Sequence, residues 1–246
     1  MKIFNFHLMP YADADLESIA RHGTAWLTYP NSHYDPEKGA ELYNRYLDEL
    51  EYADKLGFDG VCLNEHHQTA YGLMPIPGVL AGALARSVKR GRIAVLGRAL
   101  PLINNPLAVA EESAMIDNVS RGRLIAGFVR GIGAEYHTTG TNPGFSHERF
   151  HGAHDLIVRA CTEPGPFAYA GKHYQFDYVN PWPRPYQRPH PPIWIPSQGS
   201  TQTISWAARM KYTYCQTLSP IAVVARMFQI YRDEAEKAGY AAVPDQ

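Results

Sequence analysis

Four polar residues, Asn64, Glu65, His66 and His67, directly follow an apolar run at residues 61–63. An imidazole titrates near neutral pH, so a histidine here could serve as general base, general acid or neutral hydrogen-bond donor. If the run is a strand, successive side chains point to opposite faces, and His66 and His67 cannot easily bind one metal ion together. The cluster therefore fits either the rim of an active site or a set of polar caps at a strand end.

Two further segments could bind a phosphate. In "RGIG", residues 130–133, the Arg130 guanidinium can make paired hydrogen bonds to a phosphate, and the glycines let backbone N–H groups come close. In "QGSTQT", residues 198–203, a helix start would present free N–H groups, and Ser200 and Thr203 could add hydroxyl donors. Taken singly, Ser200 also fits a plain N-cap and Arg130 a surface charge. The two segments together favour a phosphate site, although "GIGAEY" lacks the third glycine of a dinucleotide fingerprint.

Three histidines, His147, His151 and His154, are spaced four and three residues apart, which places them near one face of a helix. Helical metal ligands share this spacing, but the segment contains no HExxH frame with a glutamate base. The same helix carries an apolar stripe over residues 150–157. We interpret these histidines as interface or supporting residues, and the sequence predicts no metal site.

The composition limits the class of protein. The chain has 246 residues, a net charge of −1 and 45% hydrophobic residues, as expected for one globular domain over residues 1–246 with no nucleic-acid or membrane-surface partner. No apolar run reaches the ~18–20 residues that span a bilayer, and residues 1–16 make a poor signal peptide. The three cysteines have no CxxC spacing, so we expect a cytoplasmic protein with reduced thiols.

A regular alternation of strand-like and helical patterns must position these candidate groups. Apolar runs typical of strands occupy residues 3–9, 58–65, 92–102, 123–131, 191–198 and 212–218. Helical patterns follow them at residues 39–57, 75–90, 105–122, 146–161, 200–210 and 220–239, the fourth with Ser146 as its expected N-cap. Six β-then-α units predict an α/β fold with a parallel sheet, either doubly wound or part of a (β/α)8 barrel. Both architectures bind ligands at the carboxyl ends of the strands, where the polar clusters fall.

Residues 163–192 interrupt this alternation before the fifth strand. The segment is too long and too rich in proline for an ordinary loop between a helix and a strand. Its first part has the character of a hairpin around Gly171, and its second part is expected to be extended. We interpret it as an excursion over one end of the sheet within the same domain.

Several stretches together resemble one known family. They are "LGFDGVCLNEHHQTAYG", "RIAVLGRALPLINNPLAVAEESAMIDNVSRGRLIAGFVRG", "HYQFDYVNPWPRPYQRPHPPIWIPSQGSTQT" and the helix "SHERFHGAHDLI". Over nearly its whole length the chain is similar to the bacterial luciferase-like family of flavin-dependent monooxygenases. The "EHH" after the second strand and the "SRGRL…G…RG" block are the most specific of these marks in combination.

The resemblance implies a TIM-type (β/α)8 barrel, usually dimeric, of which this chain holds about six βα units and lacks the last two. It implies reduced FMN from a separate flavin reductase, or a deazaflavin in some branches. It also implies a C4a-peroxyflavin, formed with dioxygen, that oxygenates a small organic substrate. Such a peroxide must be kept from water, so we expect residues 163–192 to close the pocket as a lid. One departure is Gly152, where the family expects an acidic residue.

The resemblance also implies roles for individual residues. His66 matches the catalytic histidine near the flavin, and Leu96–Gly97 falls where relatives often hold a non-prolyl cis peptide beneath the ring system. Arg130, Ser200 and Thr203 match the phosphate ligands. The full set expected to bind the flavin is Asn64, Leu96, Gly97, Arg130, Ile132, Gly199, Ser200 and Thr203.

Several functions stay open at this point. The first is a flavin-dependent monooxygenase, the second a non-catalytic or remnant flavin-binding protein of the same fold, and a third a deazaflavin-dependent oxidoreductase. A barrel hydrolase is a further alternative. A glycosidase needs two facing carboxylates, and Glu65 finds no second acid after the fourth or fifth expected strand.

Overall fold

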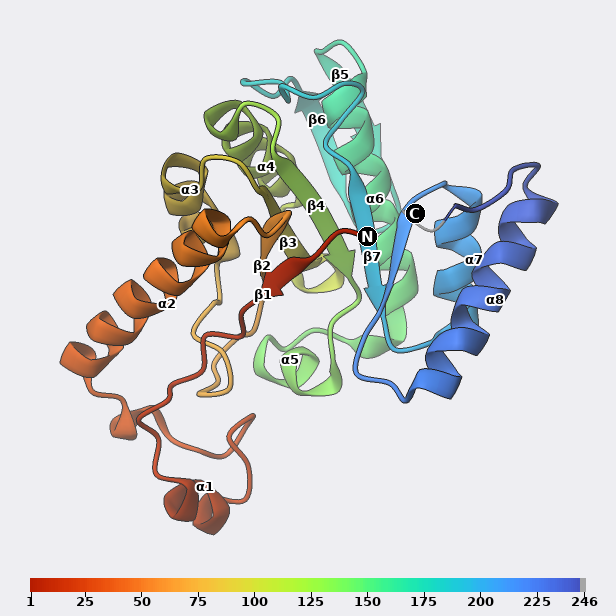
Figure 1. Ribbon diagram of the computed structural model, residues 1–246. Coiled ribbons are helices and arrows are strands. Elements are labelled where there is room, and N and C mark those ends of the chain that lie inside the picture. Colours follow the sequence, from red (N-terminus) through yellow and green to blue (C-terminus); the bar gives the residue numbers. More distant parts are fainter. Residues whose placement is uncertain (244–246) are drawn as a thin grey trace.

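A curled parallel sheet of six strands forms the centre of the molecule, as a computed structural model of residues 1–243 shows (Figure 1). The strands are β1 (Phe4–Phe6), β2 (Gly60–Leu63), β3 (Arg92–Ala99), β4 (Leu124–Val129), β7 (Ile193–Ser197) and β8 (Thr213–Gln216). They lie in the order β1-β2-β3-β4-β7-β8, so each strand pairs with the next one along the chain that belongs to this sheet. This unreversed order is that of a barrel wall and differs from a doubly wound sheet, whose order reverses at a switch point. The architecture is that of six consecutive wall strands of a TIM-type barrel, with their connecting helices.

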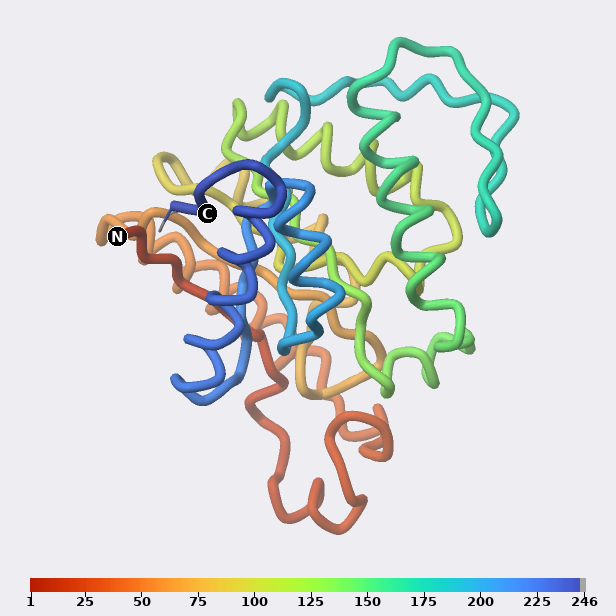
Figure 2. Tube along the Cα trace, turned by 90° about the vertical axis from the view of Figure 1, so that its right-hand side faces the viewer, coloured from red at the N-terminus to blue at the C-terminus, as the bar shows by residue number. Residues whose placement is uncertain are grey.

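Helices connect successive strands and cover the outer face of the sheet (Figures 1 and 2). They are α2 (Pro36–Leu56), α3 (Pro77–Ser87), α4 (Pro106–Ser120), α6 (Ser146–Thr162), α7 (Thr201–Arg209) and α8 (Ile221–Lys237). All six expected strands and all six expected helices are present, with ends shifted by at most three residues. Residues 244–246 of the expected single domain lie outside the described part of the chain.

The structure also contains short elements that the sequence pattern does not predict. Helix α1 (Leu16–His22) lies in the loop after β1, and helix α5 (Gly133–Thr138) directly follows β4. Single turns of 3-10 helix occur at Asn31–His33, Leu100–Leu102 and Pro143–Phe145. In Figure 1, α1 and α5 both lie at the lower end of the molecule, where the parallel strands end.

Local polar contacts explain two helix starts. Asp35 begins α2 because its carboxylate accepts hydrogen bonds from the N–H groups of Glu37 and Lys38, at 2.9 and 3.4 Å. The expected N-cap role of Ser146 is wrong, because Phe145 occupies that position and Ser146 is the first helical residue. The 3-10 turn before it runs straight into the helix, and the polar capping atom belongs to Asn142, which accepts from Gly144 N at 2.9 Å.

Side chains on the strands alternate between an outer and an inner core. Outward-facing residues pack against the helices in two clusters, one under α2 and α3 and one between α4, α6, α7 and α8. The inner face holds Cys62, Ala94 and Ile125. Phe4 of β1 and Trp194 of β7 meet there edge to face, with ring centroids 5.1 Å apart. Because β1 and β7 are not neighbours in the sheet, this contact shows how strongly the sheet curls.

The excursion at residues 163–192 contains the expected hairpin, formed by β5 (Phe167–Ala170) and β6 (Gln175–Val179). The hairpin packs along α6, where the Tyr169 hydroxyl donates to the carbonyl of Gly152 at 2.9 Å (Figure 2). Helix α6 runs through Gly152 without a break, so the missing acidic residue does not interrupt it.

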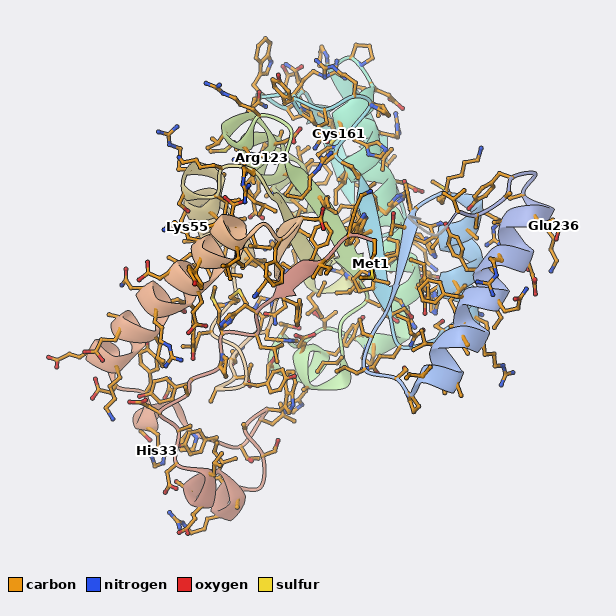
Figure 3. All side chains as sticks on the ribbon, viewed as in Figure 1. Met1, His33, Lys55, Arg123, Cys161 and Glu236 are labelled. Carbon is orange, nitrogen blue, oxygen red and sulfur yellow. The ribbon has the colours of Figure 1, made fainter. Side chains whose placement is uncertain are left out.

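The proline-rich half of the excursion runs past the amino ends of the strands. Gln187 donates to the carbonyl of Leu124, the first residue of β4, at 2.8 Å, and accepts from Arg92, the first residue of β3, at 3.1 Å. Nearby, Arg184 donates to the carbonyl of Cys161, which Figure 3 labels far from the end that carries α1. The expected lid is not supported by this arrangement, because the segment contacts the outer side of α6 and the amino end of the sheet.

Among residues 1–243, no helix combines the length and the apolar character that crossing a membrane requires.

Candidate functional site

His66 forms a close pair with a carboxylate from a neighbouring loop. Its Nδ1 lies 2.9 Å from Oε1 of Glu135, whose side chain is only 4% exposed. The second oxygen of Glu135 accepts from the backbone N–H of Ile132 at 3.1 Å, which fixes the carboxylate to the loop after β4. Ionised Glu135 requires the proton of a neutral imidazole to reside on Nδ1. Nε2 of His66, which has no hydrogen-bond partner in the described chain, is then left with a free lone pair for a ligand.

Aromatic rings hold the imidazole of His66 from two other sides. Trp26 meets it edge to face with centroids 4.9 Å apart, and Tyr71 does so at 5.3 Å. Trp26 and Tyr71 stack on each other at 4.1 Å. At Gly72, a Cβ atom would lie 3.1 Å from Cδ2 of His66, so a larger residue would press on the ring. The ring is therefore fixed in orientation and partly shielded from water.

His67, the next residue, faces a different environment. Its Nε2 lies 3.0 Å from Oε1 of Glu65, and that hydrogen bond is the main reason why the pKa of His67 is raised. The other oxygen of Glu65 lies 3.1 Å from Nη1 of Arg98, which also lies 3.7 Å from Oε1 of Glu112. The guanidinium is close enough for ion pairs, although its Nε and Nη1 have no aligned hydrogen-bond acceptor. Burial raises the pKa of Glu112.

These four residues, which we call the Glu65 network, surround the buried carboxylate of Glu65 and tie together three elements: the end of β2, strand β3 and helix α4. Glu65 Oε1 also accepts from the backbone N–H of Ala99 at 3.3 Å. Its members face one another and not the inner side of the sheet, so we interpret the network as structural.

The inner face at the end of β2 holds an unsatisfied amide. Asn64 is 3% exposed, and neither its Nδ2 nor its Oδ1 has a hydrogen-bond partner in the described residues. By the alternation of the strand, Asn64 lies on the same side as Cys62, which faces inward. Buried amides are normally hydrogen-bonded, so this one is placed to meet a ligand.

The floor beside it is nearly bare backbone. The peptide bond between Leu96 and Gly97 is cis, as the resemblance led us to expect. A Cβ atom at Gly97 would lie 2.7 Å from the carbonyl carbon and oxygen of Gly127, so β3 and β4 approach closely there. Leu96 packs into the inner cluster with Trp194. A flat ligand could therefore lie on peptide groups at this position.

A cation and a helix start lie at the ends of two adjacent strands. Arg130 directly follows β4, and the turn at Gly199 follows β7, which pairs with β4 in parallel register. Gly199 has φ +106°, and the side chain of Ser200 accepts a long hydrogen bond of 3.5 Å from Thr203 N as the N-cap of α7. Within residues 1–243 no carboxylate is ion-paired with Arg130, so its charge is free to meet an anion.

Two of the three histidines on α6, His147 and His151, lie close enough to Arg130 to feel its charge. Burial and then the charge of Arg130 lower the pKa of His147, and burial also lowers that of His151. His151 meets Trp206 of α7 at 5.0 Å. His154 is buried and lies 2.9 Å from the Tyr212 hydroxyl. No group of three metal-ligating side chains occurs in the part of the chain that the structure describes.

The structure adds residues that sequence reasoning missed. Glu135, Trp26 and Tyr71 surround His66, and Arg98 links Glu65 to α4. One signal for Glu135 was available, because a glutamate three residues after a helix-starting residue often bonds back to it. Ile132 is expected to contact the flavin, and in the structure its backbone N–H donates to the carboxylate of Glu135.

The model of the luciferase-like monooxygenase family matches residues 18–243. Among individual proteins, y4wF of Sinorhizobium fredii is 32% identical over 202 residues, which are 80% of this chain and 58% of that protein. The oxygenase component of flavin-dependent trigonelline monooxygenase from Acinetobacter baylyi is 28% identical over 164 residues, 65% of this chain and 45% of that one. The chain thus spans about half the length of the curated relatives it matches.

Solved structures agree with the fold. Monooxygenase RslO1 from Streptomyces bottropensis superposes with a TM-score of 0.80 at 28% identity, covering 99% of this chain and 68% of that one. The oxygenating constituent of 3,6-diketocamphane monooxygenase from Pseudomonas putida, solved in complex with FMN, superposes with a TM-score of 0.78 at 17% identity, covering 99% and 64%.

Proposed function

Because the chain belongs to the luciferase-like monooxygenase family, we propose that it is a flavin-dependent monooxygenase that uses reduced FMN and dioxygen to oxygenate a small organic substrate. The observation that carries the proposal is the His66–Glu135 pair, which leaves one imidazole nitrogen free two residues after the unsatisfied amide of Asn64. The names of two similar proteins support the cofactor, since one is flavin-dependent and the other was solved with FMN.

The residues present suit FMN at both of its ends. Arg130 and the start of α7, with Gly199, Ser200 and Thr203, would hold the phosphate through a guanidinium, hydroxyls and free N–H groups. Leu96 and Gly97 would lie under the ring system, where a cis peptide and close backbone leave a flat floor.

The polar edge of the ring also finds a partner. The Asn64 amide would satisfy both of its buried atoms there, and Ile132 would flank the ring from the loop after β4. When bound, the reduced flavin supplies two electrons, so that one atom of dioxygen enters the substrate and the other leaves as water.

His66 would hold or move a proton at Nε2. Glu135 keeps the Nδ1 proton in place and so presents the Nε2 lone pair to the reacting groups. Trp26 and Tyr71 fix the ring plane and exclude water from two sides. Glu135 therefore acts as a positioning residue, and His66 is the residue that would touch the reactants.

We further propose that a separate flavin reductase supplies the reduced FMN to a cytoplasmic homodimer. The name of the trigonelline relative supports a separate reductase, since it describes an oxygenase component. Exposed apolar side chains on neighbouring α3 and α4, namely Val79, Met115 and Val119, support a subunit interface.

The test is an anaerobic titration with reduced FMN, reduced deazaflavin and reduced riboflavin, followed by admission of oxygen. We expect reduced FMN to bind more tightly than riboflavin, because only FMN carries the phosphate that Arg130 would hold. Failure to bind any reduced flavin would refute the proposal. Flavin binding with only hydrogen peroxide release, across a panel of substrates, would instead identify a non-catalytic flavin-binding protein.

A further inference from the structure

A cavity of about 360 Å³ lies between the loop after β1 and the loop after β2. Its lining includes Tyr11, Tyr29, Asn31, Tyr34, Gln68 and Leu73. Gln68 follows His66 by two residues, so the cavity borders the loop that carries the imidazole. Figure 3 labels His33 in the loop on its other side, near α1. Its volume falls in the usual range for small-molecule sites.

The walls of the cavity are aromatic and uncharged. The rings of Tyr11 and Tyr34 lie 5.2 Å apart at 42°, and Tyr29 stacks on His33 at 4.7 Å and 13°. Among residues 1–243, no charged side chain belongs to the lining. Two acidic groups of the loop after β1 are already engaged, since Asp35 caps α2 and Asp13 pairs with Lys38 at 3.0 Å. An ion in this cavity would lose water without gaining a partner, whereas a flat aromatic ring would gain ring contacts.

The cavity is held open by contacts behind its walls. The Tyr11 hydroxyl accepts from Asp35 N at 3.0 Å. The ring of Tyr34 lies against Gly39, where a Cβ atom would come within 1.9 Å of the hydroxyl oxygen, so any other residue would displace the ring. Thr69 donates to the carbonyl of Ala25 at 2.9 Å and clamps the two loops together.

One wall is connected to the helix that positions His66. Gln68 donates through Nε2 to the carbonyl of Thr138 at 2.9 Å, and Thr138 belongs to α5 together with Glu135. The Oε1 atom of Gln68 and the side-chain amide of Asn31 have no hydrogen-bond partner within residues 1–243. They could bind a hydroxyl or carbonyl group at the edge of a ring.

We infer that this cavity binds the planar, uncharged aromatic part of the substrate, with a hydroxyl or carbonyl group at its edge. The inference extends the proposed monooxygenase function and rests on it, because the ligand of the cavity is a substrate only if the chain is such an enzyme. The binding of an aromatic molecule can be measured independently of flavin.

The probe is 2-naphthol, compared with decahydro-2-naphthol, a saturated alcohol of similar size, and with 2-naphthoate, an anion. Calorimetry on the full chain should show 2-naphthol binding about tenfold more tightly than either, since a tenfold change corresponds to about 1.4 kcal/mol and this lies within the range of ring–ring contacts. Equal affinity for 2-naphthol and the saturated alcohol would overturn the inference, and so would tighter binding of the anion.

Variants locate the binding. Tyr34→Ala should weaken 2-naphthol binding about tenfold, and Tyr34→Phe should retain most of it. Tyr178→Ala is the matched control, because Tyr178 is 64% exposed on the hairpin beside α6. If Tyr34→Ala fails to fold, Tyr29→Ala replaces it. Unchanged affinity in a folded cavity variant would overturn the assignment. Retained binding of reduced FMN in the same samples would show that the cavity assignment alone had failed.

Discussion

His66 and His67 are neighbours in the chain, and each faces a buried glutamate, yet their surroundings differ in kind. The second oxygen of Glu135 accepts from a backbone N–H of its own loop, and Nε2 of His66 has no partner in the described chain. Glu65 directs its second oxygen to Arg98, which joins His67 to a closed set of charges. The comparison shows that the second contact of the glutamate distinguishes the two histidines. Within residues 1–243, the carboxylate of Glu135 bonds only to its own loop besides His66, and His66 stays available for chemistry. The carboxylate of Glu65 also pairs with Arg98, and His67 becomes part of a structural ion network.

The largest expected effect comes from removing His66, the histidine whose Nε2 is free. His66→Ala should lower substrate oxygenation by about 10²–10⁴-fold, the range of general acid–base catalysis, while reduced FMN still binds. Product formation and oxygen uptake, measured together, would show electrons diverted to hydrogen peroxide. His137→Ala, at an exposed position of α5, is the matched control. Full oxygenation by His66→Ala would remove His66 from the mechanism.

The next effect comes from removing the charge at the centre of the Glu65 network. Glu65→Gln should lower the free energy of unfolding by about 3 kcal/mol, because it leaves Arg98, whose side chain is only 12% exposed, without its nearest counter-charge. Urea denaturation measures this change. Glu17→Gln, at an exposed position, should change the same quantity by less than about 0.5 kcal/mol. Equal values for both variants would mean that the Glu65 network is not structural.

A smaller effect tests whether Glu135 only positions His66. Glu135→Gln keeps an acceptor for Nδ1 but removes the charge, so kcat should fall about tenfold with little change in KM. Glu135→Asp should restore part of the rate if the carboxylate is the essential feature. A rise in KM without loss of kcat would point to a role in substrate binding instead.

The smallest effect concerns pH. The pKa of His67 is raised above its ordinary value of about 6.5 by its hydrogen bond to Glu65. The protonated form is therefore favoured in the folded state, and its contribution to stability is complete below about pH 6.5 and lost as pH rises through the higher folded pKa. The stability difference between the native protein and His67→Gln should shrink from pH 6 to pH 8. A difference that grows over this range would contradict the assigned pairing.

The strand ends were predictable because a parallel sheet collects them at one edge. An apolar run that stops at Asn64 and an Arg130 followed by glycine are both local signals, and the topology confirms that they follow two strands of one sheet, β2 and β4, with β3 between them. The cis peptide at Leu96–Gly97 was predictable only through the resemblance.

The partners of these residues were not predictable from local pattern. Helix α5 has six residues, too few for a periodic stripe, so Glu135 had no helix to be assigned to. The position of residues 163–192 depends on which outer surface of α6 was available to the hairpin, and this is decided by packing between segments distant in the chain. A correct hairpin prediction therefore gave no information about a lid.

The facing glycines in β3 and β4 have a consequence for redesign of the molecule. At Gly127 a single methyl group would lie 2.2 Å from the carbonyl oxygen of Val95, and at Gly97 it would meet the backbone of the opposite strand. Backbone atoms cannot swing aside as a side chain can, so even alanine would wedge the two strands apart. Libraries that aim to alter ligand preference should leave these two positions untouched and draw their diversity from the loops.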